Sequence, residues 1–165
     1  MRHGNPKLPS TRRRSMVLEL LEPRMLLANT ALITELMASN GNTRLDEDGD
    51  SSDWLEVHNP TDNSISLNGW HLTDDANDLT KWEFPDVSLA ADEYLIVYAS
   101  DKNRAVSGSE LHTNFKLTSG GEYLALVEAD GITIAHAYAP SFPEQFQDVS
   151  YGLGTSGLKT VLVQE

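Results

Sequence analysis

The sequence predicts an all-β fold, an antiparallel β-sandwich built from about seven or eight short strands. From residue 31 onward, short runs with strand-like alternation are separated by turn residues. After residue 30, no segment shows ten or more residues of helical periodicity with caps. Two dipeptides, Asn68-Gly69 and Asp130-Gly131, are strong hairpin signals. With 165 residues, the chain is about the size of one domain.

The first two strands are expected over residues 31–39 and 53–60. The run ALITELMAS (31–39) alternates in part, and one of its sides is expected to carry Leu32, Leu36 and Ala38. The run DWLEVHNP (53–60) alternates cleanly and stops at a proline. Leu55 and Val57 should therefore share one face of the second strand.

The next part of the chain predicts a hairpin and a short strand. In SISLNGWHLTD (64–74), Asn68-Gly69 is expected to join a strand at Ile65 and Leu67 to a strand at Trp70 and Leu72. The run KWEFP (81–85) alternates its aromatic residues and ends at a proline.

The remaining strands follow residue 93. The run YLIVYAS (94–100) is almost continuously apolar and β-rich, which favours a central buried strand. Asp130-Gly131 is expected to pair EYLALVEA (122–129) with ITIAHAYAP (132–140). The final run TVLVQE (160–165) is either an eighth strand or the start of a further element.

The net charge of −13 is unevenly distributed along the chain. Residues 1–28 carry six Lys or Arg against two Glu, a net +4, so the remaining 137 residues carry −17. An acidic body disfavours binding to nucleic acid or anionic membranes and favours divalent cations. The sequence has no apolar run near 18 residues, so we expect no transmembrane segment. It also has no cysteine, which excludes disulfides and thiolate zinc sites.

The N-terminal 28 residues have the order of an export signal. The basic cluster RRRS (12–15) precedes MVLELLEPRMLLA (16–28), an apolar segment that ends in a small residue. Within it, LELLEPRMLLA resembles an L-E-x-L-E-x-R-x-L-L-A segment found near the start of many large exported bacterial proteins. We therefore expect residues 1–28 to direct export and the protein to be extracellular or at the cell surface. The alternative is a disordered or weakly helical tail.

The order of the strand-like runs resembles the lamin tail domain. The matching segments are LITELMASN (32–40), DWLEVHNP (53–60), LNGWHLTDD (67–75), FPDVSLAADEYLIVYAS (84–100), HTNFKLTSGGEYLALVEADG (112–131) and VSYG (149–152). The chain departs from the family pattern at His58, where tyrosine is usual, and at residues 91–92, where Pro-Gly is usual.

This resemblance implies an immunoglobulin-like antiparallel β-sandwich over residues 29–152, with Trp70 in the core. Residues 153–165 would then be a C-terminal linker or the start of a truncated further element. The chain is most similar to the bacterial branch of the family, whose members are exported and joined to other domains. Those domains include hydrolases, nucleases and spore-coat-type kinases.

An acidic stretch precedes the second strand. DEDGDSSDW (46–54) packs five carboxylates into nine positions, and Arg44 is the only basic residue within ten positions. The stretch is not an EF-hand, because Ser51 stands where that motif needs glycine and a strand is expected to follow. Calcium nevertheless accepts six to eight oxygen ligands in flexible geometry. We therefore predict a structural calcium site formed by Asp46, Asp48, Asp50 and Asp53. The alternative is a solvated acidic turn.

Four other features admit two interpretations each. His58, His71 and His136 lie in predicted strands and are either single strand residues or a weak metal site. HTNFKLTSGGEYL (112–124) is either a ligand loop or core residues followed by a glycine turn. The aromatic residues either fill the core or form an exposed binding face; they are Trp54, Trp82, Tyr98 and Tyr138. GLGTSG (152–157) matches the nucleotide-binding motif G-x-G-x-x-G, but that motif needs a helix after it and none is expected here. The segment is therefore better explained as a loop or linker.

No local signature of a catalytic site is present, so we expect the chain not to be an enzyme. The expected function is that of a binding or structural module of an exported bacterial protein, in adhesion, scaffolding or substrate presentation. Its partner would be a protein or a cell-surface or matrix ligand, and its ligand and oligomeric state stay open. The alternative is an accessory domain of a secreted hydrolase or nuclease whose catalytic part lies outside this chain.

Overall fold

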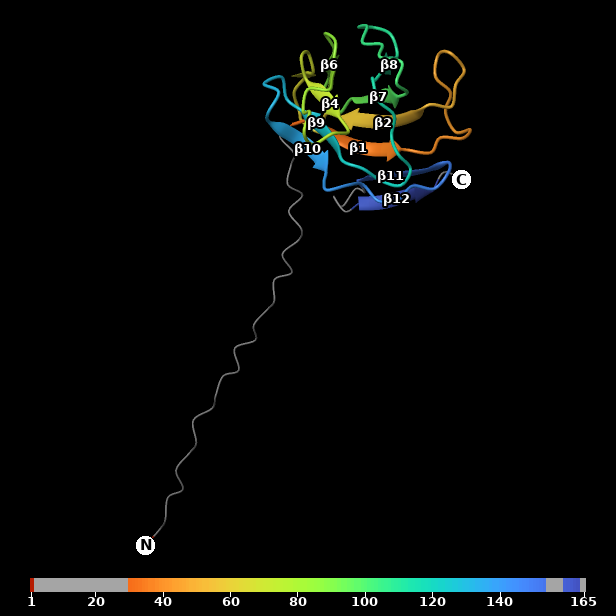
Figure 1. Ribbon diagram of the computed structural model, residues 1–165. Coiled ribbons are helices and arrows are strands. Elements are labelled where there is room, and N and C mark those ends of the chain that lie inside the picture. Colours follow the sequence, from red (N-terminus) through yellow and green to blue (C-terminus); the bar gives the residue numbers. More distant parts are fainter. Residues whose placement is uncertain (2–29, 154–158, 164–165) are drawn as a thin grey trace.

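The computed structural model describes residue 1 and residues 30–153 and 159–163 (Figure 1). All regular secondary structure in these residues is β, with twelve strands in three sheets. This confirms the predicted all-β sandwich, although its strands are shorter and more numerous than the seven or eight expected. The predicted export segment lies outside the described residues, apart from Met1.

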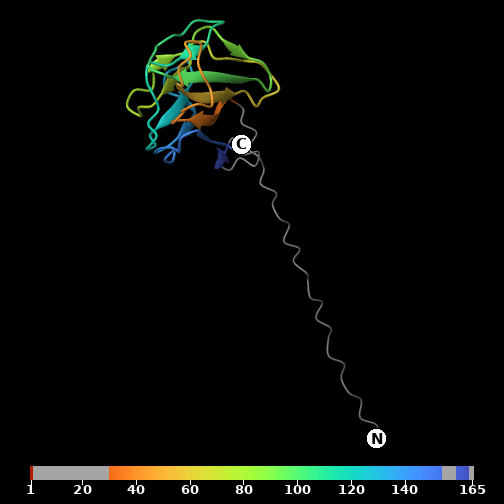
Figure 2. The same ribbon diagram turned by 90° about the vertical axis from the view of Figure 1, so that its right-hand side faces the viewer.

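The largest sheet has six strands. In spatial order they are β12 (Lys159–Val163), β11 (Val149–Leu153), β1 (Leu32–Met37), β2 (Asp53–His58), β7 (Tyr94–Ala99) and β8 (Leu111–His112). Neighbouring strands are antiparallel except β7 and β8, which are parallel. Figure 2 shows β7, β2 and β1 one above another across the body. The prediction of an interior strand at 94–100 is confirmed, because β7 lies between β2 and β8.

The second sheet has four strands and a small third sheet has two. The four-stranded sheet runs in the order β10 (Ile134–Tyr138), β9 (Leu124–Val127), β4 (His71–Thr73) and β5 (Trp82–Glu83). The third sheet pairs β3 (Ile65–Ser66) with β6 (Ser88–Leu89).

The main hydrophobic core lies between the six-stranded and four-stranded sheets. Leu55 and Val57 of β2 belong to the same buried cluster as Leu72 of β4 and Leu126 of β9, and each of these side chains is fully buried. The clean alternation of DWLEVH therefore gives the predicted core face. Burial of such side chains is the main favourable term in the stability of this fold.

Strand β1 contains a β-bulge that changes which of its residues enter the core. Its register shifts between Ile33 and Glu35, so that Ile33 pairs with Val57 and Leu36 pairs with Leu55. Ile33 and Leu36 are fully buried, whereas Leu32 is half-buried. The expectation that Leu32 would share a side with Leu36 was wrong, because one extra residue inverts the alternation.

The two hairpin signals have different outcomes. At Asp130-Gly131 the turn joins β9 to β10, which pair antiparallel, and this prediction is confirmed. Gly131 has a φ of 72°, in the left-handed region that favours glycine. The hairpin at Asn68-Gly69 is wrong: a turn forms there, but β3 pairs with β6, and β4 pairs with β5 and β9. The turn therefore carries the chain from one sheet into another.

The four aromatic residues considered as an exposed binding face are buried. Their exposed fractions are 5% for Trp54, 3% for Trp82, 2% for Tyr98 and 0% for Tyr138. The interpretation of these rings as an exposed face is therefore wrong. Trp82 and Tyr138 fill the main core, whereas Trp54 and Tyr98 belong to a second, smaller buried cluster. Trp70, which the family resemblance placed in the core, is partly buried and packs against the core cluster.

The last described strand lies at the edge of the largest sheet. Strand β12 pairs antiparallel with β11 over five residue pairs and forms the outermost strand, drawn in dark blue in Figure 1. The run TVLVQE is thus a strand for most of its length. Of the segment GLGTSG, Gly152 and Leu153 belong to β11 and the rest lies outside the described residues.

Candidate functional site

The acidic stretch belongs to a longer loop, residues 40–52, here named the acidic loop. This loop covers a small second cluster of Met37, Trp54 and Tyr98, which is separate from the main core. These three residues are cross-strand neighbours on β1, β2 and β7. Since Leu55 beside them enters the main core, they lie on the opposite face of the six-stranded sheet.

Tyr98 attaches the acidic loop to this outer face. Its hydroxyl donates to the Leu45 carbonyl at 3.0 Å and accepts from the Arg44 Nε at 3.0 Å. The Arg44 guanidinium also lies 5.9 Å from the centre of the Tyr98 ring, within range of a cation–π interaction. The Thr43 hydroxyl donates to the Met37 sulfur at 3.1 Å. The loop therefore has a defined place on the sheet.

Asn40 closes the base of the loop. Its side-chain amide donates to the carbonyls of Arg44 and Ser52 at 2.6 and 2.8 Å. Its backbone N–H donates to the Asp53 carboxylate at 3.1 Å. The two ends of the loop are held together before any charge in it is considered.

Asp46 lies at the centre of the acidic loop, and its side chain has no exposed surface. One of its oxygens accepts the backbone N–H groups of Asp48 and Asp50, both at 3.0 Å. The other oxygen accepts the Ser52 hydroxyl at 2.6 Å. Gly49 allows the tight turn between them, with a φ of 83°. The buried carboxylate thus organises the turn through local hydrogen bonds.

A lysine from a distant part of the chain pairs with three carboxylates of the loop. The Lys102 ammonium lies 2.6, 2.7 and 2.9 Å from the carboxylates of Asp46, Asp48 and Asp50, respectively. Arg104 adds two contacts, 2.8 Å to Glu47 and 2.7 Å to Asp48. Four of the five carboxylates in the stretch are therefore paired with protein cations.

The pKa values follow from this pairing. Burial alone would raise the pKa of Asp46, but hydrogen bonds from Lys102, Ser52 and two backbone N–H groups outweigh it and hold the pKa well below its usual range. Burial would lower the pKa of Lys102, but its three carboxylate partners outweigh that effect and raise the pKa. Both groups are charged at neutral pH.

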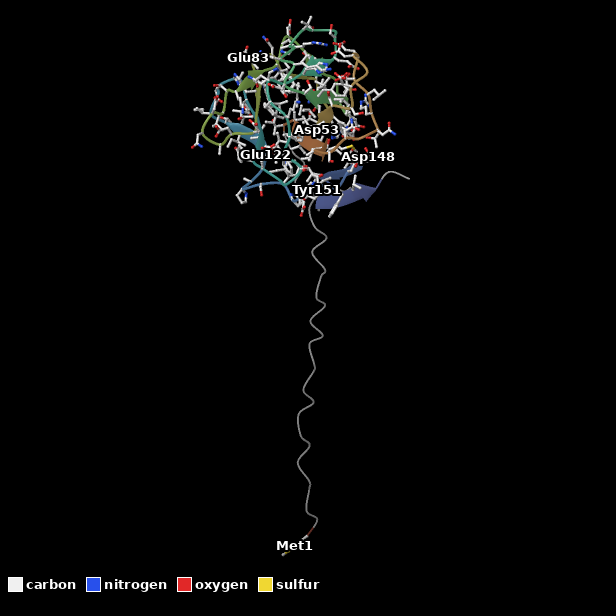
Figure 3. The ribbon with its side chains drawn as sticks, turned by 45° about the vertical axis from the view of Figure 1, so that its right-hand side comes forward. Met1, Asp53, Glu83, Glu122, Asp148 and Tyr151 are labelled. Atoms are coloured by element: carbon white, nitrogen blue, oxygen red, sulfur yellow. The ribbon has the colours of Figure 1, made fainter. Side chains whose placement is uncertain are left out.

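The predicted metal ligands divide into two sets. Asp46, Asp48 and Asp50 each place an oxygen within 4.8 Å of the others, and they are the only group of three or more such residues found in the described part of the chain. Asp53 (labelled in Figure 3) is not in this group. Its carboxylate binds Asn40, and burial raises its pKa. An ion at the centre of the three aspartates would occupy the position that the Lys102 ammonium holds.

His112 is a buried residue of the site that the sequence analysis named only as the first residue of the segment 112–124. Its Nδ1 lies 2.9 Å from the Ser100 hydroxyl, and its Nε2 lies 3.8 Å from a Glu47 oxygen. This order of serine, histidine and acid resembles a catalytic triad, but the His112 ring is fully buried beneath the Tyr98 ring and no substrate can reach it. Burial lowers its pKa, so the ring is neutral at pH 7. Its hydrogen bond to Ser100 joins β8 to the chain that follows β7, whereas its Nε2 has no hydrogen-bond partner among the described residues.

The other histidines of the described residues, His58, His71 and His136, lie apart from this loop. His58 is on β2, with its Nε2 2.9 Å from Asp92 and its ring stacked on Tyr94 at 3.9 Å. His71 and His136 are in the other sheet and flank β9, beside its successive residues Val127 and Leu126. Successive strand residues point to opposite faces, so these two rings do not form a site together.

The segment 112–124 contributes to the core. Phe115 and Leu117 are 4% and 6% exposed and belong to the main cluster. Gly121 follows in a turn with a φ of 89°. This confirms the interpretation as core residues followed by a glycine turn.

The acidic loop and the strands around it lie within a part of the chain that matches a known protein family. A family profile described as Lamin Tail Domain matches residues 28–140, more than half of the chain. The chain belongs to the lamin tail domain family. In this lamin tail domain, the matched range contains β1 to β10 and the whole acidic loop. No curated protein matches the chain.

The described residues were also compared with the length and hydropathy that a membrane-spanning helix needs. In residues 30–153 and 159–163, the structure has no helix long and apolar enough to cross a bilayer.

Proposed function

We propose that this lamin tail domain is a non-catalytic binding or structural module of an exported bacterial protein, acting in adhesion, scaffolding or substrate presentation. The observation that carries the proposal is membership of a family of immunoglobulin-like structural domains. The strongly acidic body and the export-like order of residues 1–28 support it. The buried position of His112 supports the non-catalytic part, because it removes the one triad-like arrangement in the site from contact with substrate.

The export part is tested by fractionating a bacterial culture that expresses the full chain with a C-terminal tag. The expected result is a tagged product in the medium or on the cell surface, shortened by removal of the segment within residues 1–28. A product found only in the cytosol with an intact N-terminus would refute export.

The binding part is tested with the purified chain and intact cells of the same culture. Saturable retention on the cell surface, lost when the chain is unfolded with urea beforehand, is expected. An unrelated acidic β-sandwich is the matched control, because it shows whether charge alone causes retention. Equal retention of the control would refute specific binding.

We further propose that calcium and the Lys102 ammonium compete for the carboxylates of Asp46, Asp48 and Asp50. These three residues offer the oxygen ligands that calcium prefers, and the ammonium within 2.9 Å of each must leave before an ion can enter. Asp53, the fourth ligand expected from the sequence, would join only after the loop moved. Calcium should therefore bind weakly and stabilise the parent only at millimolar concentration.

A calcium titration followed by thermal melting tests this proposal. The parent should melt at a higher temperature with millimolar calcium, and the double variant Asp48→Asn/Asp50→Asn should show a smaller rise. Magnesium is the control ion, because it dehydrates reluctantly and suits a flexible loop poorly. An unchanged melting temperature of the parent in calcium would refute calcium binding.

A further inference from the structure

A small polar pocket opens beside the acidic loop. Its volume is about 270 Å³, and it lies where β2 begins and β7 ends. One wall is the chain from Asp50 to Asp53, and the opposite wall is formed by Ala99, Ser100 and the lysines Lys102 and Lys116. Asp53 pairs with Ala99 in the sheet, and Ser100 bridges to Lys116, so the two walls are joined by strand pairing at this end of the sheet.

Several of the polar groups that line the pocket are already engaged. The Lys102 ammonium has three donors and three carboxylate partners. The Ser52 hydroxyl donates to Asp46, and the Ser100 hydroxyl is bonded to His112. These groups shape the pocket but have little capacity left for a ligand.

Three charged groups keep capacity for a ligand. In the described part of the chain, Lys116 has no carboxylate within 4.0 Å, unlike Lys81, Lys102 and Arg104, which all form ion pairs. One Asp53 oxygen accepts from Asn40, and no described group bonds to the other. Asp50 has one oxygen on Lys102 and a side chain that is 65% exposed. The pocket thus presents one ammonium without a direct carboxylate contact, near enough to Asp53 to act on its charge, and two partly free carboxylates.

We propose that this pocket binds a small zwitterion of the size of a free amino acid, with its ammonium toward Asp53 and Asp50 and its carboxylate toward Lys116. Lys102 is held by its three carboxylate partners, so the charges left for a ligand are the Lys116 ammonium and the carboxylates of Asp53 and Asp50. A ligand that carries both charges matches this arrangement better than a simple cation or a simple anion. The volume lies just below the range of about 300–1,000 Å³ that is typical of drug-sized ligands, which suits a single amino acid.

Burial strengthens one end of this site. Asp53 is half-buried, so its carboxylate lacks full hydration. A ligand ammonium placed beside it would return that missing stabilisation, and charges interact more strongly there than in open water. Lys116 is exposed and is expected to orient the ligand more than to hold it. This inference rests on the proposed binding function and names a ligand class for it.

The test is a titration of the ¹⁵N-labelled chain followed by NMR, with alanine as the first probe and a panel of common amino acids after it. Saturable shifts are expected at the amides of Asp53, Ser100 and Lys116, with a Kd in the millimolar range. Alaninamide lacks the carboxylate and N-acetylalanine lacks the ammonium, and each should bind about tenfold more weakly than alanine. If no amino acid causes saturable shifts at these amides, the inference is wrong.

Two variants show which end of the ligand contacts Lys116 and which end contacts Asp53. Lys116→Met should weaken alanine binding and leave alaninamide binding unchanged, because only the carboxylate contact is lost. Asp53→Asn keeps an oxygen for the Asn40 N–H, so it should fold, and it should weaken alanine but not N-acetylalanine. Lys81→Met changes the net charge equally outside the pocket and serves as control. Equal binding by all three variants would overturn the inference, while surface retention of the whole chain would be unaffected.

Discussion

Replacing Lys102 by methionine is the sharpest test of how the acidic loop is held. The substitution keeps the length and apolar stem of the side chain and removes only the ammonium. Asp46, Asp48 and Asp50 then lose their shared cation, and their charges repel one another. The loop should loosen and the domain should lose stability.

The size of the loss follows from burial. The contact with Asp46 dominates, because the Asp46 side chain is fully buried, whereas Asp48 and Asp50 are 38% and 65% exposed and screened by water. Removing one partner of a buried ion pair costs about 3–5 kcal/mol. Asp46 keeps three other hydrogen bonds, so we expect a loss of about 2–3 kcal/mol. For a domain of this size that lowers the melting temperature by about 6–10 °C.

Urea unfolding at pH 7, followed by tryptophan fluorescence, measures this loss. Lys116→Met is the matched control, because it removes the same charge from a lysine without an ion pair, and its midpoint should stay close to that of the parent. Millimolar calcium should raise the midpoint of Lys102→Met more than that of the parent, since the ion no longer competes with an ammonium. Equal midpoints for Lys102→Met and its control would refute the reasoning.

Three further changes follow from individual contacts. Tyr98→Phe removes the hydroxyl bonds to Leu45 and Arg44 and should cost about 1–2 kcal/mol in urea unfolding. Asn59→Ala removes a fully buried amide that donates to three backbone carbonyls, and it should cost about 2–4 kcal/mol by the same measurement. The folded-state pKa of His112 is depressed, so its contribution to the free energy of unfolding is present above about pH 6.5 and is lost as the pH falls below that value. His112→Gln should reduce this loss between about pH 7.5 and 5.5.

Exposed residues of the same type provide the controls for the tyrosine and asparagine variants. Tyr94 is 53% exposed, and Tyr94→Phe should leave the urea midpoint unchanged. Asn63 is exposed, and Asn63→Ala should cost far less than Asn59→Ala. If Tyr98→Phe is as stable as Tyr94→Phe, the hydroxyl does not hold the loop. An identical pH profile for the parent and His112→Gln would contradict the role given to burial of that ring.

The sequence predicts local features of this fold better than distant ones. The alternation in DWLEVH and the Asp130-Gly131 hairpin are correct, because side-chain period and turn chemistry are set by neighbouring residues. Asn68-Gly69 has the same local chemistry and forms a turn, yet its flanking strands pair elsewhere. The partner of a strand is decided by packing between sheets, which a dipeptide does not encode. The bulge in β1 is a similar case, because the extra residue is specified by its pairing with β2.

In the candidate site, too, the sequence predicts the local features and misses the contact between distant residues. The sequence identified the acidic stretch and the convergence of Asp46, Asp48 and Asp50, because alternate aspartates around a glycine curl the chain locally. It did not identify Lys102, which lies 56 residues beyond Asp46. One signal was present: antiparallel pairing of the strands at 53–60 and 94–100 would place residues that follow the second strand beside residues that precede the first. The observed pairing of Asp53 with Ala99 has this effect.

The separation of the carboxylates and Lys102 along the chain also has a kinetic consequence. Until β2 and β7 have paired, the aspartates of the acidic loop repel one another without a counter-charge, and closing so long a segment costs entropy. The loop should therefore close after the folding transition state, on a sheet that is already formed. Lys102→Met would then leave the refolding rate nearly unchanged and speed unfolding, so the lysine sets the lifetime of the folded domain rather than the time it takes to form.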